Sequence, residues 1–243
     1  MSGQKASKSA NTKNELSFAV KSYLFVYNGA QVAGWSYILY RTFMHYLQGG
    51  TTDNLWPVVG NSLIYFQNAA IVEVLNVLLG YVRSPISITF VQVLSRVAVV
   101  GGLLYPASAA QVSIGLPLIL TAWSITEIIR YSFYALNLIN AVPYFLVWCR
   151  YTFFYALYPI GVTGELLLYY ATQNYVAETK MWTAEMPNAA NFTFNYRLTL
   201  LLIMAFYVPQ FPQMYLHMIN QRKKVIGGAS SAAPAPSTSK KVK

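Results

Sequence analysis

Six long stretches of mainly apolar residues run through the chain, separated by short polar segments. Each stretch approaches or exceeds the roughly 20 residues that a helix needs to cross the hydrocarbon core of a bilayer. The pattern therefore predicts an all-α integral membrane bundle of about six transmembrane helices. The approximate bounds of the stretches are 22–40, 57–81, 86–105, 114–138, 144–171 and 196–219.

Polar, lysine-containing tails precede and follow these stretches. Residues 1–21 have a composition that cannot bury a core, so we expect a disordered basic tail, with the membrane domain spanning residues 22–221. Residues 222–243 form a second basic, flexible tail. It ends in Lys240-Lys241-Val242-Lys243, which matches the dilysine retrieval signal of endoplasmic reticulum membrane proteins. The alternative is a solvated basic tail that meets this pattern by chance.

The distribution of positive charge predicts the orientation of the helices. Only 10% of the residues are charged, yet the net charge is +10. With both termini in the cytosol, most Lys and Arg residues flank the spans on the cytosolic side, as membrane proteins prefer. Arg41, Lys180 and Arg197 are the exceptions. Since the basic residues lie in tails and at span ends, no compact basic domain is available and we expect no nucleic-acid partner.

Cysteine and histidine give no support to a metal or redox site. Cys149 is the only cysteine, which excludes an internal disulfide and a thiolate metal cluster. His and Cys residues do not occur at metal-ligand spacing, and no glycine-rich phosphate loop is present. We therefore expect neither a metal nor a cofactor. The first 15 residues do not resemble a cleavable signal peptide, so the first span is expected to direct insertion.

Several ionisable residues fall within or at the ends of the apolar stretches. An unpaired charge at mid-membrane costs at least about 2.5 kcal/mol, so each of them should pair, line a cavity or take part in chemistry. Glu127 and Arg130 are three positions apart and can pair on one helix, and Arg96 can reach Glu73 or Glu127 from another. These four residues are typical of an ion-pair network that fixes helix packing. The others are Arg150 and Glu165.

Glu165 differs because its own stretch holds no basic residue at its depth. Tyr151, Tyr158 and Glu165 are spaced by seven, which places them on one face of a helix. An acid in such surroundings can exchange protons near neutrality. The structural alternative is a tyrosine at a packing seam.

A proline and two glycines lie between Tyr158 and Glu165. Pro159 cannot donate to the carbonyl of Tyr155, so a bend is expected there. Gly161 and Gly164 remove side-chain bulk between the tyrosine and the acid. Together these residues predict a cavity, although a simple proline bend at a helix contact would give the same pattern.

Several strings, in one order over about residues 20–224, resemble the 3-hydroxyacyl-CoA dehydratases, once named protein tyrosine phosphatase-like proteins. They include residues 123–134 (WSITEIIRYSFY), 150–152 (RYT), 158–165 (YPIGVTGE) and 186–188 (MPN). The resemblance implies an endoplasmic reticulum enzyme of very-long-chain fatty acid elongation that removes water from a (3R)-3-hydroxyacyl-CoA to give the trans-2-enoyl-CoA. Phosphatase activity is not expected, because no arginine follows Cys149 six positions later.

The resemblance also implies the catalytic residues, which are Tyr158 and Glu165. Gly164 departs from the serine of many members, a change that affects packing more than chemistry. Dehydration needs a base at C2 and an acid at C3, and neither a metal nor a redox cofactor. We assign Glu165 as base and Tyr158 as proton donor, with the reverse left open. Because seven residues correspond to about 10.5 Å of helix rise, a bend, a water or the substrate must span the gap.

Binding partners follow from the same reading. Arg83, Arg150 and the cluster at 222–224 lie at the predicted cytosolic end, where CoA phosphates would approach. The alternative, membrane orientation and contact with lipid headgroups, is slightly favoured for each of these residues. Besides the acyl-CoA substrate and membrane lipid, the resemblance implies other elongase-cycle enzymes, the condensing enzyme and the reductases, as partners. The alternatives are a catalytically inactive membrane scaffold of the elongase complex and a proton-coupled carrier.

Overall fold

A computed structural model of the protein describes residues 16–189 and 191–227, apart from the side chains of residues 87 and 88. The described part is helical, as predicted, and its only β-pairing is an isolated bridge between Ala184 and Phe194. The helices are α1 (Phe18–Leu47), α2 (Trp56–Ala69), α3 (Ile71–Leu78), α4 (Ile86–Val99), α5 (Ser108–Gln111), α6 (Gly115–Leu138), α7 (Tyr144–Thr152), α8 (Phe154–Thr179) and α9 (Tyr196–Arg222), with the short turns η1 (Thr52–Asn54), η2 (Val100–Leu104) and η3 (Lys223–Gly227).

Each of the six apolar stretches is helical, but some are divided. The second becomes α2 and α3, which separate at Ala70, and the fifth becomes α7 and α8, which separate at Phe153. The third is α4 continued by the π-helical turn η2. Helix breaks of this kind cannot be read from hydrophobicity, because the residues on either side are equally apolar.

The ends of two helices differ from the prediction. Helix α1 begins at Phe18, four residues before the predicted span, because the Ser17 hydroxyl accepts a hydrogen bond from the backbone N–H of Val20 at 3.3 Å. The prediction of disorder is therefore wrong for residues 18–21. At the other side of the bundle α8 continues to Thr179, so the polar loop before α9 is shorter than expected. Residues 1–15 and the terminal dilysine motif lie outside the described residues.

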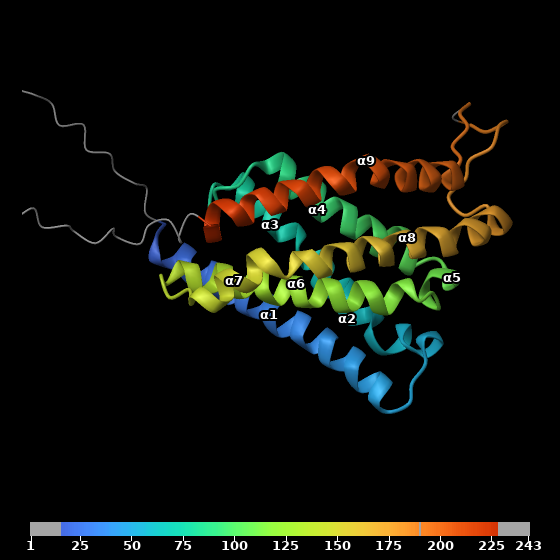
Figure 1. Ribbon diagram of the computed structural model, residues 1–243. Coiled ribbons are helices and arrows are strands. Elements are labelled where there is room, and N and C mark those ends of the chain that lie inside the picture. Colours follow the sequence, from blue (N-terminus) through green and yellow to red (C-terminus); the bar gives the residue numbers. More distant parts are fainter. Residues whose placement is uncertain (1–15, 190, 228–243) are drawn as a thin grey trace, which may run out of the picture.

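The long helices run alternately up and down along one axis (Figure 1). Helix α6 packs against α1 on one side and α8 on another, and α9 lies against α8. The beginning of α1 and the end of α9 lie at the same end of the bundle (Figure 1). Helix α9 contributes little to the core, and Leu200 is its only buried residue in the described part.

Helices α6 and α8 approach closely at a pair of glycines. A Cβ atom on Gly115 would lie 2.5 Å from the carbonyl oxygen of Gly164, and a Cβ atom on Gly164 would lie 2.8 Å from Ile119. Gly161 likewise faces Ala122 and Trp123 on α6. Both glycines face α6, Gly164 so closely that a Cβ atom would not fit and Gly161 at ordinary van der Waals distance. The expectation that they open a cavity is therefore wrong.

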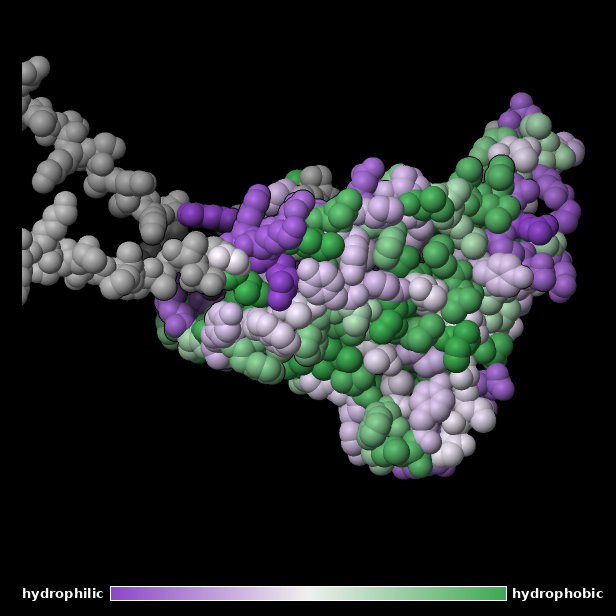
Figure 2. Space-filling model, viewed as in Figure 1, coloured by the Kyte–Doolittle hydropathy of each residue, from purple (hydrophilic) through white to green (hydrophobic). Residues whose placement is uncertain are grey.

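Apolar side chains cover the middle of the molecule, and hydrophilic ones gather towards its two ends (Figure 2). Two helical segments in the described part are long and apolar enough to cross a membrane, Trp56–Leu78 (α2 and α3) and Tyr196–Gly227 (α9 and η3). The segment Thr89–Leu104 is apolar but shorter. Helix α6 is long enough but carries Glu127 and Arg130 among its apolar residues. The six-span arrangement remains a prediction.

Candidate active site

Four ionisable residues from three helices form one ion-pair cluster. Arg130 on α6 contacts both oxygens of Glu73 on α3, at 2.8 and 3.0 Å, and its Nε donates to Glu127 at 2.8 Å. Arg96 on α4 also pairs with Glu127. Two arginines thus balance two glutamates, and the predicted packing network is confirmed. We call these four residues the ion-pair cluster.

Glu165 lies on α8, which contributes no residue to the ion-pair cluster, and it has different partners. Its carboxylate accepts a hydrogen bond from Trp123 Nε1 at 3.1 Å and another from the Tyr207 hydroxyl at 2.5 Å. Within residues 16–189 and 191–227 it makes no ion pair. The guanidinium of Arg96 stacks on the Trp123 ring, 5.2 Å from its centroid. Trp123 therefore contacts Arg96 through its ring and Glu165 through its N–H.

Tyr158 lies two turns before Glu165 on α8. Its ring stacks on Phe211 of α9, with the centroids 5.2 Å apart and the planes nearly parallel. No hydrogen bond joins Tyr158 to Glu165 among the described residues, although the two interact electrostatically. Both instead contact α9, through Phe211 and Tyr207, which are one turn apart. Helix α9 therefore contacts both candidate residues, a feature that the sequence did not predict.

Prolines interrupt the hydrogen bonding of both helices near this site. Pro159 leaves the Tyr155 carbonyl without a backbone donor, and the Tyr215 hydroxyl of α9 lies 3.5 Å from that oxygen. Helix α9 contains Pro209 and Pro212 close to Tyr207. Backbone that lacks these hydrogen bonds bends at lower cost than a regular helix. The contact between α8 and α9 is thus the least regular part of the site.

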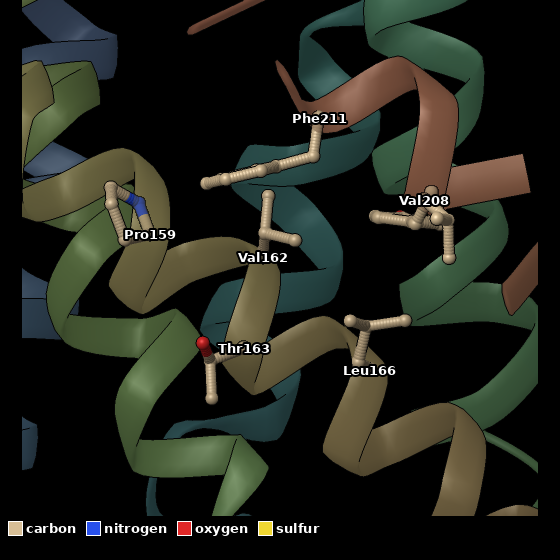
Figure 3. A pocket seen from close by; sticks show the side chains of 7 residues that line it. Pro159, Val162, Thr163, Leu166, Val208 and Phe211 are labelled. Carbon is tan, nitrogen blue, oxygen red and sulfur yellow. The ribbon is translucent and has the colours of Figure 1, made fainter.

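A groove with a volume of about 250 Å³ lies between α8 and α9. In Figure 3 the side chains of Val162 and Leu166 extend from α8 towards Phe211 and Val208 of α9. Tyr207 also lines this groove, so its ring borders the groove while its hydroxyl reaches Glu165. The full lining is Pro159, Val162, Thr163, Leu166, Tyr207, Val208 and Phe211.

Basic side chains lie where α7 meets the end of α9. Arg150 stacks on the ring of Phe133 at 4.5 Å, and Arg222 stacks on Tyr155 at 5.6 Å and approaches the Thr152 hydroxyl at 3.4 Å. Tyr155 is one turn before Tyr158, so Arg222 lies near the end of the site. This end of the molecule carries a hydrophilic surface in Figure 2.

The fold and the site together define a class: an all-helical, apolar bundle that holds a carboxylate among aromatic hydrogen-bond donors beside a tyrosine. The chain belongs to the family described as protein tyrosine phosphatase-like protein, PTPLA, whose family model matches residues 67–228.

Similar proteins share a more specific name. The chain is 48% identical to the very-long-chain (3R)-3-hydroxyacyl-CoA dehydratase hpo-8 of Caenorhabditis elegans, over 87% of this chain and 98% of that protein. It is 41% identical to very-long-chain (3R)-3-hydroxyacyl-CoA dehydratase 2 of Homo sapiens, over 84% of this chain and 81% of that protein. The Arabidopsis thaliana dehydratase PASTICCINO 2 is 36% identical, over 87% and 96% of the two chains. No solved structure gives a significant match.

The word phosphatase in the family's description has no counterpart in the site. Cys149 is buried in α7, and the residue six positions later is Tyr155 rather than an arginine. A cysteine nucleophile for phosphoryl transfer needs cationic surroundings and access for a charged substrate. The residues around Glu165 match acid–base chemistry better.

Proposed function

We propose that this chain is a very-long-chain (3R)-3-hydroxyacyl-CoA dehydratase of fatty acid elongation, with Tyr158 and Glu165 as its catalytic residues. The relatives named as such dehydratases support the activity, because their similarity to this chain extends over most of both lengths. The assignment of the site rests on the surroundings of Glu165. It is a carboxylate within an apolar bundle, held by hydrogen bonds from Trp123 and Tyr207. Among the described residues it makes no ion pair, and Arg96 interacts with it only at longer range.

The reaction needs two proton transfers and no change of oxidation state. Glu165 takes the proton from C2 of the substrate, the C2–C3 double bond forms, and the C3–O bond breaks. Tyr158 gives its hydroxyl proton to the departing oxygen, so the products are the trans-2-enoyl-CoA and water. Proton exchange between Glu165 and Tyr158, through water, then restores the starting state. General acid–base catalysis of this kind contributes typically 10²–10⁴-fold to a rate.

The substrate fills the gap between the two groups in this proposal. Tyr158 and Glu165 have no direct hydrogen bond. Tyr207 donates to Glu165 and is one turn before Phe211, which stacks on Tyr158. A substrate inserted at Tyr207 would meet the carboxylate on one side and the phenol on the other. Tyr207 and Trp123 orient the carboxylate, which makes them positioning residues.

We also propose a location in the endoplasmic reticulum membrane, with six spans and both termini in the cytosol. The 24 residues of α6 and the 26 of α8 correspond to about 36 and 39 Å at about 1.5 Å per residue, enough for a hydrocarbon core of about 30 Å. The apolar middle of the surface supports the same view (Figure 2). Arg150 and Arg222 would then face the CoA phosphates, with membrane lipid and other elongase-cycle enzymes as neighbours.

Purified full-length protein and a 3-hydroxyacyl-CoA provide the test. The wild type should form enoyl-CoA, and Tyr158→Phe and Glu165→Gln should abolish this while the protein stays folded by thermal melting. Tyr151→Phe is the matched control. Tyr151 lies on α7, across the break at Phe153 from Tyr158 and not on the same helix as the sequence predicted, so loss of its hydroxyl should leave activity intact. An inactive wild type would favour the scaffold alternative, and turnover by Glu165→Gln would refute the assigned site.

A further inference from the structure

The groove between α8 and α9 has the chemistry of a hydrocarbon site. Its walls are formed by aliphatic and aromatic side chains, and the only hydroxyls among the lining residues belong to Thr163 and Tyr207. Val162, Leu166 and Phe211 present carbon to the space between the helices (Figure 3). Apolar surface of this kind favours an apolar occupant, because burial removes hydrocarbon from contact with water.

The groove is continuous with the candidate catalytic residues. Pro159, at one end of it, directly follows Tyr158, and Phe211 of its wall stacks on the Tyr158 ring. Tyr207 lines the groove and donates to Glu165. The two α9 residues that contact the candidate pair are thus also walls of the groove. A hydrocarbon chain in the groove would therefore start close to both Tyr158 and Glu165.

We propose that this groove binds the part of the fatty acyl chain next to the reacting carbons, an inference that rests on the proposed dehydratase function. The occupant is a saturated hydrocarbon chain joined to a CoA thioester. Ligand pockets for drug-sized molecules have about 300–1,000 Å³, and the groove has about 250 Å³. It therefore holds a segment of a very long chain and not the whole of it.

The remainder of the acyl chain leaves the groove sideways. Val208 at the groove is 74% exposed and Phe206, two residues earlier, is 62% exposed, so the outer face of α9 offers further hydrocarbon surface. A chain that leaves the groove beside Val208 reaches this apolar face directly. The end of the acyl chain then lies in the bilayer. The groove binds a hydrocarbon segment but does not select for the full length of the chain.

Photo-crosslinking with the full-length wild-type protein tests the groove directly. The probe is a palmitoyl-CoA analogue with a mid-chain diazirine, which is not a substrate because it lacks the 3-hydroxyl. After irradiation in lipid nanodiscs and digestion, we expect label on residues 159–166 and 207–211, removed by excess unlabelled palmitoyl-CoA. Competable label elsewhere in the bundle, or no competable label at all, overturns the proposal. These outcomes do not depend on turnover, so they are distinct from a failure of the dehydratase function.

A pair of tryptophan variants provides a second test through kinetics. Val162→Trp fills the groove, whereas Leu216→Trp places the same tryptophan side chain at an exposed site on α9 outside it. Displacing about two methylene groups from the groove corresponds to roughly a tenfold rise in KM for a long-chain substrate. We expect this rise for Val162→Trp and less than about twofold for Leu216→Trp. Equal KM values for the two variants, with the label absent from the groove, would refute the proposal.

Discussion

Glu127 and Glu165 are two carboxylates on neighbouring helices with opposite kinds of partner. Glu127 has 2% of its side chain exposed and is paired with Arg96 and Arg130. Glu165 accepts hydrogen bonds from Trp123 and Tyr207, which are neutral. A charge paired by two arginines is fixed in its ionised form, because its protonation would leave the arginines unbalanced. A carboxylate with only neutral donors can change its protonation state without disturbing an ion pair.

The two carboxylates also share a neighbour. Arg96 pairs with Glu127 and stacks on Trp123, whose N–H reaches Glu165. Since the two sites lie this close together, their depth in the bundle does not explain their different character. The different partners do explain it. This comparison supports a structural role for Glu127 and the proposed catalytic role of Glu165.

Glutamine in place of each carboxylate should produce the largest contrast. Glu165→Gln keeps an oxygen that can accept from Trp123 and Tyr207 but loses the base, so we expect kcat to fall by roughly 10³-fold with little change in melting temperature. Glu127→Gln should instead lower the melting temperature, because both of its arginines lose a counter-charge. Enoyl-CoA formation and thermal melting of the two proteins, measured side by side, check this. If both substitutions mainly lower the melting temperature, the proposed difference in role between Glu127 and Glu165 is wrong.

Removal of Arg130 should have the next largest effect. Arg130→Met leaves Glu73 and part of the charge of Glu127 unbalanced inside the bundle, and breaking such a buried pair costs about 3–5 kcal/mol of unfolding free energy. The matched control is Lys180→Met, which breaks an ion pair with Glu185 whose side chains are 63% and 59% exposed. That change should cost less than about 1 kcal/mol. Unfolding in detergent measures both, and equal losses would argue against the cluster as the stabilising region.

Loss of one neutral donor should affect the rate moderately. Tyr207→Phe removes a hydrogen bond to Glu165, and hydrogen bonds to charged groups contribute about 1.5–3 kcal/mol, so kcat should fall roughly tenfold or more with KM nearly unchanged. Tyr196→Phe on the same helix removes a hydroxyl that donates to the Gly102 carbonyl at 2.9 Å. This control should lower stability and leave kcat intact. A fall in kcat for both variants would mean that α9 packing, and not the donor, is responsible.

The smallest effect is expected at the basic end. Arg222→Gln should raise KM for the acyl-CoA about two- to fivefold, because partly exposed ion pairs contribute about 0.2–1 kcal/mol. The difference from wild type should shrink at high salt. Steady-state kinetics at two ionic strengths, with Lys180→Gln at the other end of the bundle as control, measure this. A salt-independent change would point to a structural role for the stacking of Arg222 on Tyr155.

The features that the sequence predicted are those that depend on local pattern. The six apolar stretches form helices because hydrophobic length alone selects them, and the ion-pair cluster follows from the cost of burying single charges. Glu127 and Arg130 are three residues apart, so their pairing is a local property. The sequence allows Arg96 to contact either Glu73 or Glu127, since helix order alone does not fix which side chains meet.

The features that the sequence did not predict depend on contacts between distant segments. Tyr207 is one of 20 tyrosines, and nothing in its neighbourhood marks it as the partner of Glu165. Trp123 occurs in a string that resembles the dehydratase family, but its N–H has a role only once α6 faces α8. Gly161 and Gly164 predict a cavity because glycine lacks a side chain, but both residues face α6, and at Gly164 the close approach of α6 leaves no room for a Cβ atom. The groove lies on the neighbouring face of α8.

The most direct measurement follows the proton at C2. Wild-type protein and Glu165→Gln are incubated with a trans-2-enoyl-CoA in deuterated water, and the 3-hydroxyacyl-CoA formed by the reverse reaction is analysed by mass spectrometry. If Glu165 transfers the C2 proton, the wild type should give product with deuterium at C2 and the variant, at equal folded concentration, should give almost none. Rapid formation of C2-deuterated product by Glu165→Gln would contradict the account.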